Sequence, residues 1–161
     1  MTISQRFRNG SLDEKDTEIL ETLHRDGRAS LADLARNVGL SSPSVSERIK
    51  RLEDAGVIEG FSAVINPKAL GLNIGAWLRI RPIPGKLEKV AEILQGINEI
   101  VECDRITGED CFVAKAFVAE VEDIARLVDR ITPYAMTNTS IIQTSPVKRR
   151  LVPLPKKKNA S

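Results

Sequence analysis

The stretch from Leu31 to Ile65 constrains the fold of this chain more than any other part of it. Apolar residues recur at helical spacing from Leu31 to Val38, and Gly39 follows at the position where a left-handed residue ends a helix. A second helical pattern comes directly after this turn, and a β-rich segment follows it. This order predicts a winged helix-turn-helix, an arrangement typical of modules that read DNA.

The second helix of this stretch has the face that a recognition helix needs. Val45, Ile49 and Leu52 fall on one inward side, and Pro43 suits the first turn of the helix because no intrahelical donor is lost there. Serines near the helix start can approach base edges, while Lys and Arg side chains can reach guanine or phosphate. We expect these residues to contact DNA: Ser42, Pro43, Ser44, Ser46, Glu47, Arg48, Lys50 and Arg51.

An ordinary solvated amphipathic helix remains the alternative for this segment, since periodicity alone does not separate the two. The glycine turn and the β-rich stretch of residues 57–65 favour the DNA interpretation, because that stretch is long enough for a two-stranded wing. Upstream, the pattern of residues 12–27 predicts a supporting helix capped by Asp13. The first domain is therefore expected to span residues 1–65.

Composition excludes several classes of protein. The chain has 161 residues, 42% of them hydrophobic, which suits one or two small domains. It has no apolar run of 18 residues and no secretory signal pattern, so a cytoplasmic protein is expected. Its two cysteines, Cys103 and Cys111, make neither a disulfide framework nor a zinc site. No phosphate loop or nucleophile motif appears, so neither an enzyme nor a bound cofactor or metal is expected.

The charge of the chain is distributed unevenly. Residues 1–65 and residues 66–147 each carry nine basic and eleven acidic residues, whereas residues 148–161 carry six basic residues and no acid. The formal charge of +2 therefore comes wholly from the tail. The first domain is not a globally basic binder, so its binding should depend on local charge, geometry and dimerisation. The basic tail, residues 151–161 with the preceding basic triplet, is either a solvated end or a further contact with DNA.

A second domain with a different hydrophobic pattern follows a hinge at residues 66–73. Strand-like and helical patterns alternate through residues 74–150 in the order β-α-β-β-α-β, with a turn at residues 108–110 and a last strand from Thr137 to Val147. Right-handed crossovers fold this order into a ferredoxin-like antiparallel sheet with both helices on one face. The fold class is therefore α+β. The other face of the sheet, with Trp77, would be bare in a monomer, so a homodimer is expected.

The chain resembles the Lrp/AsnC, or feast/famine, transcriptional regulators over about residues 11–150. The matching segments are LDEKDTEILETLHRDGR, LSSPSVSERIKRLEDAGVIEGFSAVINPKALG and TNTSIIQTSPVK. The resemblance implies a winged helix-turn-helix joined to a ligand-responsive βαββαβ domain. It also implies dimers that assemble into tetramers, octamers or larger rings on promoter DNA, and an amino-acid effector held between dimers.

The resemblance also implies an effector site at the turn after the second strand, where the family often has Gly-x-x-Asp. Gly108 matches, whereas Cys111 stands at the position of the acid, so Glu109 or Asp110 would have to replace it. The candidate effector-binding residues are Thr107, Gly108, Glu109, Asp110, Cys111, Thr137, Thr139 and Ser140. A plain β-turn at an oligomer interface, with threonines that merely suit a strand, is the alternative.

Three functions are consistent with the sequence. The leading one is a sequence-specific DNA-binding transcriptional regulator tuned by an amino acid or related metabolite. A nucleoid-type architectural protein with loose sequence preference is the second, and the ratio of specific to non-specific binding separates the two. A small enzyme or metabolite-binding module is the third, but the sequence offers no paired catalytic groups for it.

Overall fold

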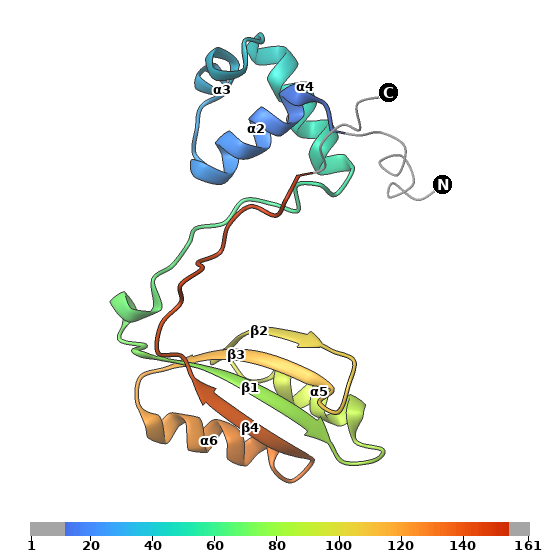
Figure 1. Ribbon diagram of the computed structural model, residues 1–161, viewed down its shortest axis with the longest axis vertical. Coiled ribbons are helices and arrows are strands. Elements are labelled where there is room, and N and C mark those ends of the chain that lie inside the picture. The colour runs from blue at the N-terminus through green and yellow to red at the C-terminus, as the bar shows by residue number, and fades with distance from the viewer. Residues whose placement is uncertain (1–11, 155–161) are drawn as a thin grey trace. The chain divides into compact units, whose positions relative to one another are not determined.

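The computed structural model describes residues 12–154 of the chain (Figure 1). Within them, the first compact unit comprises residues 12–64 and 147–154, and the second comprises Ile65–Pro146. The sequence analysis assigned residues 74–150 to one domain, whereas the structure assigns 147–150 to the first unit. The cause is the packing of Leu154 against the apolar core of that unit. In the described part of the chain, no helix is long and apolar enough to cross a membrane.

The first unit is built on three helices: α2 (Glu14–Arg25), α3 (Leu31–Val38) and α4 (Ser42–Asp54). The predicted cap at Asp13 is confirmed, because its side chain accepts the backbone N–H of Asp16 while the Asp16 carboxylate accepts the N–H of Asp13. This reciprocal arrangement satisfies two donors that a helix start leaves unpaired. The core of the unit is made by Leu12, Ile19, Leu20, Leu34, Ala35, Val38, Val45 and Leu52.

The turn between α3 and α4 has the predicted geometry. Gly39 ends α3 with a φ of 67°, in the left-handed region, where a side chain would strain the backbone. Ser41 then caps α4 by accepting the backbone N–H of Ser44. Since both signals lie within a few residues of the turn, the helix-turn-helix was predictable from the sequence, and the structure confirms it.

The two-stranded ribbon expected over residues 57–65 is not formed: these residues make no strand in the structure. Val57 and Ile58 instead donate their backbone N–H groups to the carbonyl of Leu52, which closes the end of α4. The rest of the stretch runs extended with its apolar side chains outside, and Val64 is 97% exposed. A ribbon needs a partner strand for its backbone groups, and this short stretch contains no turn that would supply one.

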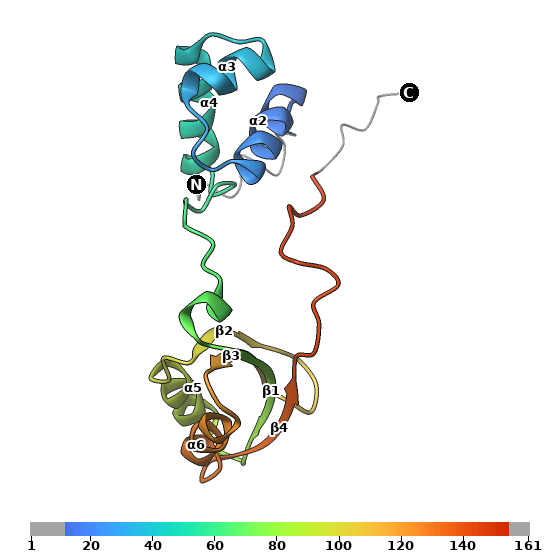
Figure 2. The ribbon, with the colours of Figure 1, turned by 90° about the vertical axis from the view of Figure 1, so that its left-hand side faces the viewer.

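The second unit has the predicted ferredoxin-like topology. Its elements are β1 (Ile74–Pro82), α5 (Leu87–Gln95), β2 (Ile100–Arg105), β3 (Phe112–Val118), α6 (Val121–Ile131) and β4 (Ala135–Ile141), preceded by a 3-10 turn, η1 (Pro67–Leu70). The four strands pair antiparallel in the order β2-β3-β1-β4. Both helices cover the same face of the sheet (Figure 2). The last strand ends at Ile141 and not at Val147. In its register with β1, Ile141 pairs with Ala76 and the Ile142 N–H donates to the Gly75 carbonyl, so residues 144–147 would lie beyond the start of β1 at Ile74.

The two faces of this sheet differ in burial. Leu78, Ile80 and Ala114 point into the core beneath α5 and α6 and are fully buried. On the opposite face Trp77 lies beside Lys115, whose ammonium sits 5.4 Å from the centre of the indole ring. Trp77 remains 38% exposed. This face is the one that the sequence analysis expects a second copy of the chain to cover.

Candidate nucleic-acid interface and ligand site

The exposed side of α4 begins at its first turn. Pro43, Ser44, Ser46, Glu47 and Lys50 are exposed, because the buried Val45 and Leu52 hold the opposite side of the helix against the core. The first turn of α4 contains no acidic residue, so no carboxylate there competes with a ligand for the partial positive charge of the helix start. The partial positive charge of the helix start, which no acid neutralises, suits contact with a phosphate group. The small polar side chains and the amino group of Lys50 suit contact with the phosphate backbone and base edges.

The two arginines of α4 form ion pairs with Asp16 of α2 and with Asp13, which caps that helix. One Nη atom of Arg48 donates to Asp13 at 2.6 Å and to Asp16 at 2.8 Å. Arg51 donates to both carboxylate oxygens of Asp16 at 2.8 Å. The sequence analysis expects Arg51 to contact DNA, whereas in the structure its guanidinium joins α4 to α2. Ser42, another predicted contact, is half-buried at the helix start.

Asp16 is the residue of this site that the sequence analysis missed. It is only 2% exposed, and its carboxylate accepts hydrogen bonds from both arginines of α4. A buried carboxylate must be paired, because burial of an isolated charge costs several kcal/mol. The available signal was an acid three residues after the helix cap, on the side that carries Ile19 and Leu20, but this spacing equally fits a simple capping box.

The ion pairs also shift proton affinities. Burial alone would raise the pKa of the Asp13 carboxyl, but hydrogen bonds from Arg48 and from the Asp16 N–H, with the charges of both arginines, hold it below 3.8. The hydrogen bonds to Asp13 and Asp16 raise the pKa of Arg48 above its usual value. Both shifts favour the charged forms of Asp13 and Arg48. The group of Asp13, Asp16, Arg48 and Arg51 is here called the α2–α4 ion cluster.

Among the described cations of α4, Lys50 alone forms no ion pair. The structure therefore divides the predicted DNA contacts into two groups. Lys50 and the exposed serines are available to an outside ligand, whereas Arg48 and Arg51 have a structural partner in Asp16.

The turn predicted to hold an effector carries a second group of charges, here called the turn ion cluster. An Nη atom of Arg81, near the end of β1, lies 2.5 Å from the Glu109 carboxylate, and its Nε lies 3.7 Å from that of Asp110. Gly108 has a φ of 117°, a conformation in which a side chain would be strained. Arg81 is absent from the predicted site residues, although its alternation with Trp77 and Arg79 fits the strand pattern.

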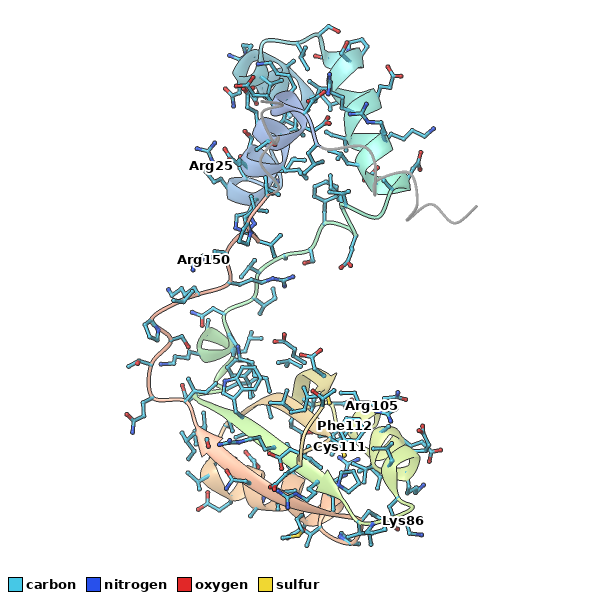
Figure 3. All side chains as sticks on the ribbon, turned by 45° about the vertical axis from the view of Figure 1, so that its right-hand side comes forward. Arg25, Lys86, Arg105, Cys111, Phe112 and Arg150 are labelled. Atoms are coloured by element: carbon cyan, nitrogen blue, oxygen red, sulfur yellow. The ribbon has the colours of Figure 1, made fainter. Side chains whose placement is uncertain are left out.

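Cys111, which stands at the sequence position of the acid, has its side chain toward the core. Its backbone N–H donates to the carbonyl of Ile80, and its side chain packs against the core beneath the sheet. Figure 3 shows it beside Phe112, at the end of the sheet where Arg105 closes β2. Glu109 and Asp110, and not Cys111, are therefore the groups of this turn that face solvent with a charge.

The threonines and serine of β4 are spread along the strand. Thr137 pairs with Ile80, close to the turn, whereas Thr139 pairs with Leu78 and Ser140 with Trp77. Ser140 is thus four residues from the partner of Arg81, or roughly 13 Å along the sheet. Thr137 and Thr139 also lie on the face of the sheet opposite to Ser140, since alternate residues point to opposite faces. Within one chain, only Thr137 lies at the same end of the sheet as the turn.

Comparison with known proteins gives both units a family. A family model described as winged helix-turn-helix DNA-binding matches residues 12–59, and one described as the Lrp/AsnC ligand binding domain matches residues 76–152. The HTH-type transcriptional regulator FL11 of Pyrococcus furiosus is 39% identical over 122 residues, which are 76% of this chain and 81% of the relative.

Solved structures agree with the sequence relatives. Bacillus subtilis LrpC superposes with a TM-score of 0.83 at 30% identity, covering 87% of this chain and 100% of that one. A feast or famine regulatory protein from M. tuberculosis, complexed with L-methionine, superposes with a TM-score of 0.82 at 34% identity, covering 90% and 100%. The relatives are regulators and not enzymes. The chain therefore belongs to the Lrp/AsnC family of DNA-binding transcriptional regulators.

Proposed function

We propose that this regulator reads double-stranded promoter DNA with the exposed side of α4. The observation that carries the proposal is the exposure of Ser44, Ser46 and Lys50 on a helix whose opposite side packs against the core through Val45 and Leu52. The helix start can approach phosphate, the serines can approach base edges, and Lys50 can reach a guanine or a phosphate. Pro43 and Glu47 lie on the same exposed side. Such a protein acts in the cytoplasm, where promoter DNA is accessible to it.

The test is to measure affinity for a duplex selected from a random library with the unaltered protein. Lys50→Ala is expected to weaken binding to the selected duplex by about tenfold, corresponding to roughly 1.4 kcal/mol, which is typical of the loss of a base or phosphate contact. Lys86→Ala is the matched control, because Lys86 is an exposed lysine of the second unit. Equal affinity for the two variants would show that α4 does not meet DNA through this face.

We infer that the second unit binds a small amino acid at the turn ion cluster. Glu109 and Asp110 can accept the α-ammonium group, and Arg81 can donate to the α-carboxylate. The M. tuberculosis relative complexed with L-methionine supports this class of effector. Thr137 lies near the turn but on the helix-covered face of the sheet, opposite to Arg81. Thr137, Thr139 and Ser140 would therefore belong to this site only if a second copy of the chain brought them there.

A thermal-shift screen of the twenty amino acids tests this inference. A ligand at about 100 times its Kd should add roughly 2.7 kcal/mol to the free energy of unfolding, which raises the melting temperature by several degrees. Asp110→Asn should remove the shift, whereas Asp129→Asn, at an exposed position of α6, should keep it. No shift with any amino acid would exclude this effector class and leave regulation by concentration and assembly.

We also propose that two copies join through the open face of the sheet around Trp77, and that such dimers assemble into tetramers or octamers. A two-fold dimer presents two copies of α4 to two half-sites. Light scattering should show at least a dimer at micromolar concentration, and a monomer would refute the proposal. Near-equal affinity for selected and bulk DNA would instead favour the architectural function.

A further inference from the structure

The segment of residues 147–154 returns from the second unit to the DNA-reading unit. It belongs to the first compact unit although it follows the second in sequence. Leu154 packs against the cluster that contains Leu20 and Leu52, and it is half-buried there. Its neighbour Val152 is 70% exposed. The contact is therefore made by a particular side chain, and the end of this segment is part of the helix-turn-helix unit.

The helix-turn-helix by itself is a poor electrostatic match for DNA. Residues 12–64 contain seven basic and eleven acidic residues, a net charge of −4. Four of the seven cations form ion pairs within the unit, namely Lys15, Arg36, Arg48 and Arg51. Affinity for duplex DNA depends on cations that neutralise phosphates. The helices alone offer few cations that are not already paired with a carboxylate.

The returning segment supplies what the helices lack. Lys148, Arg149 and Arg150 are consecutive and exposed, and in the described residues none of them is ion-paired. Figure 3 shows Arg150 on this segment and Arg25 at the end of α2, two basic side chains of the same unit. Adding residues 147–154 reduces the charge of the unit from −4 to −1. Three further lysines follow at positions 156–158 in the sequence, outside the described residues.

We propose that residues 147–154 are a second DNA-binding element, anchored to the reader by Leu154 and binding the phosphate backbone through Lys148, Arg149 and Arg150. The inference rests on the proposed function, because it needs α4 to meet DNA. Phosphate contacts carry no sequence information. This element should therefore add affinity equally to selected and unselected duplexes, whereas α4 should account for the difference between them.

The experiment measures affinity of the full-length protein as a function of salt, with the selected duplex and with a random-sequence duplex of the same length. The variant carries Lys148→Gln, Arg149→Gln and Arg150→Gln together. The slope of log affinity against log salt should fall by about 0.9 for each phosphate that the variant no longer neutralises. Affinity in 0.1 M salt should fall roughly tenfold or more for both duplexes, with the ratio between them unchanged.

A matched charge control removes three cations from the second unit through Lys86→Gln, Lys89→Gln and Arg126→Gln. All three side chains are exposed: Lys86 directly precedes α5, Lys89 lies on α5 and Arg126 lies on α6. This control changes the net charge equally but should leave the slope within experimental error. A second comparison tests the anchor: Leu154→Ser removes the side chain that packs on the core, and Val152→Ser, at an exposed position, is its control. Both variants keep every charge. Only Leu154→Ser should weaken binding, by several-fold, since only Leu154 holds the segment on the core.

The outcomes separate this inference from the proposed function. If the unaltered protein selects no duplex and binds none, the proposed function fails and this inference fails with it. If the protein binds but the triple variant keeps the original slope and affinity, the second element is refuted while α4 remains the reader. An equal decrease of slope in the triple variant and in the charge control would show an effect of net charge alone, and would also refute it.

Discussion

The α2–α4 ion cluster and the turn ion cluster are built from the same chemistry in opposite surroundings. In the first, Asp16 is 2% exposed and receives hydrogen bonds from Arg48 and Arg51. In the second, the side chain of Glu109 is 85% exposed and meets one guanidinium, that of Arg81. A buried carboxylate has no water to replace a missing partner, whereas an exposed one does. The first cluster is therefore suited to hold two helices together, and the second to exchange partners with a ligand.

This difference in burial explains why the guanidinium groups of Arg51 and Arg81, which the sequence does not distinguish, have different roles. Arg51 joins α4 to α2 across 35 positions of the sequence, so it fixes how the reading helix is presented. Arg81 contributes little to folding through its exposed pair, and its guanidinium remains open to a carboxylate from solution. A mutation series on the two clusters can test the contrast directly.

The largest effect is expected for Asp16→Ala. It leaves two arginines of α4 without their shared partner and removes the cap interaction with Asp13, so the free energy of unfolding should fall by about 3 kcal/mol. Urea unfolding followed by circular dichroism measures the decrease. Glu53→Ala, an exposed acid of α4, is the control and should stay within about 0.5 kcal/mol. Equal decreases would mean that the buried cluster does not stabilise the unit.

Arg51→Ala should have the next largest effect on stability. It removes two charge-assisted hydrogen bonds to Asp16, which are worth about 1.5–3 kcal/mol together at a partly exposed site. Lys50→Ala, one position earlier and without an ion pair, should cost less than about 0.5 kcal/mol. The two variants thus separate structure from recognition, because only Lys50→Ala is expected to reduce DNA affinity without lowering stability. A stable Arg51→Ala protein would contradict the structural assignment.

The acid side of the stability profile should depend on Asp13. Its pKa lies below 3.8 in the folded chain, so its contribution is complete above about pH 4 and is lost as the pH falls through the folded-state pKa. Asp13→Asn keeps a capping oxygen but cannot titrate. Unfolding midpoints measured between pH 6 and pH 3 should therefore fall less steeply for this variant. Asp54→Asn, at the exposed end of α4, should follow the unaltered protein.

The smallest effect on stability is expected for Arg81→Ala. Its partners Glu109 and Asp110 stay hydrated without it, so the free energy of unfolding should change by no more than about 1 kcal/mol. The same variant should abolish the thermal shift produced by an amino acid, because the α-carboxylate no longer has its donor. A large decrease in stability without ligand would show that the turn ion cluster is structural and would remove the contrast between the two clusters.

Local features of the sequence predicted most of the fold. The caps at Asp13, Ser30 and Ser41, and the turn at Gly39, each involve residues within three positions of one another. The βαββαβ order follows from the alternation of strand and helix patterns, and the handedness of crossovers leaves few ways to fold it. The wing was predicted wrongly, because β-rich composition over residues 57–65 does not state whether a partner strand exists.

The candidate sites were only partly predictable. Helical spacing placed Ser44, Ser46 and Lys50 on the exposed side of α4, as the structure has them. It did not reveal Asp16 as the partner of Arg48 and Arg51, because helical spacing predicts which side of its helix a residue occupies and not which residue of another helix it contacts. In the second unit, the turn was located by its glycine, whereas Arg81 was not recognised as the cation beside it.

The sequence by itself determined where the helices begin and end, the order of the strands and the family of the regulator, because these depend on short-range signals and on the hydrophobic pattern. The tertiary structure decided which charges pair and which side chains remain available. It also decided that Leu154 returns to a core formed 100 and more residues earlier in the chain. Such contacts depend on side chains brought together from distant positions, and no local pattern in the sequence encodes them.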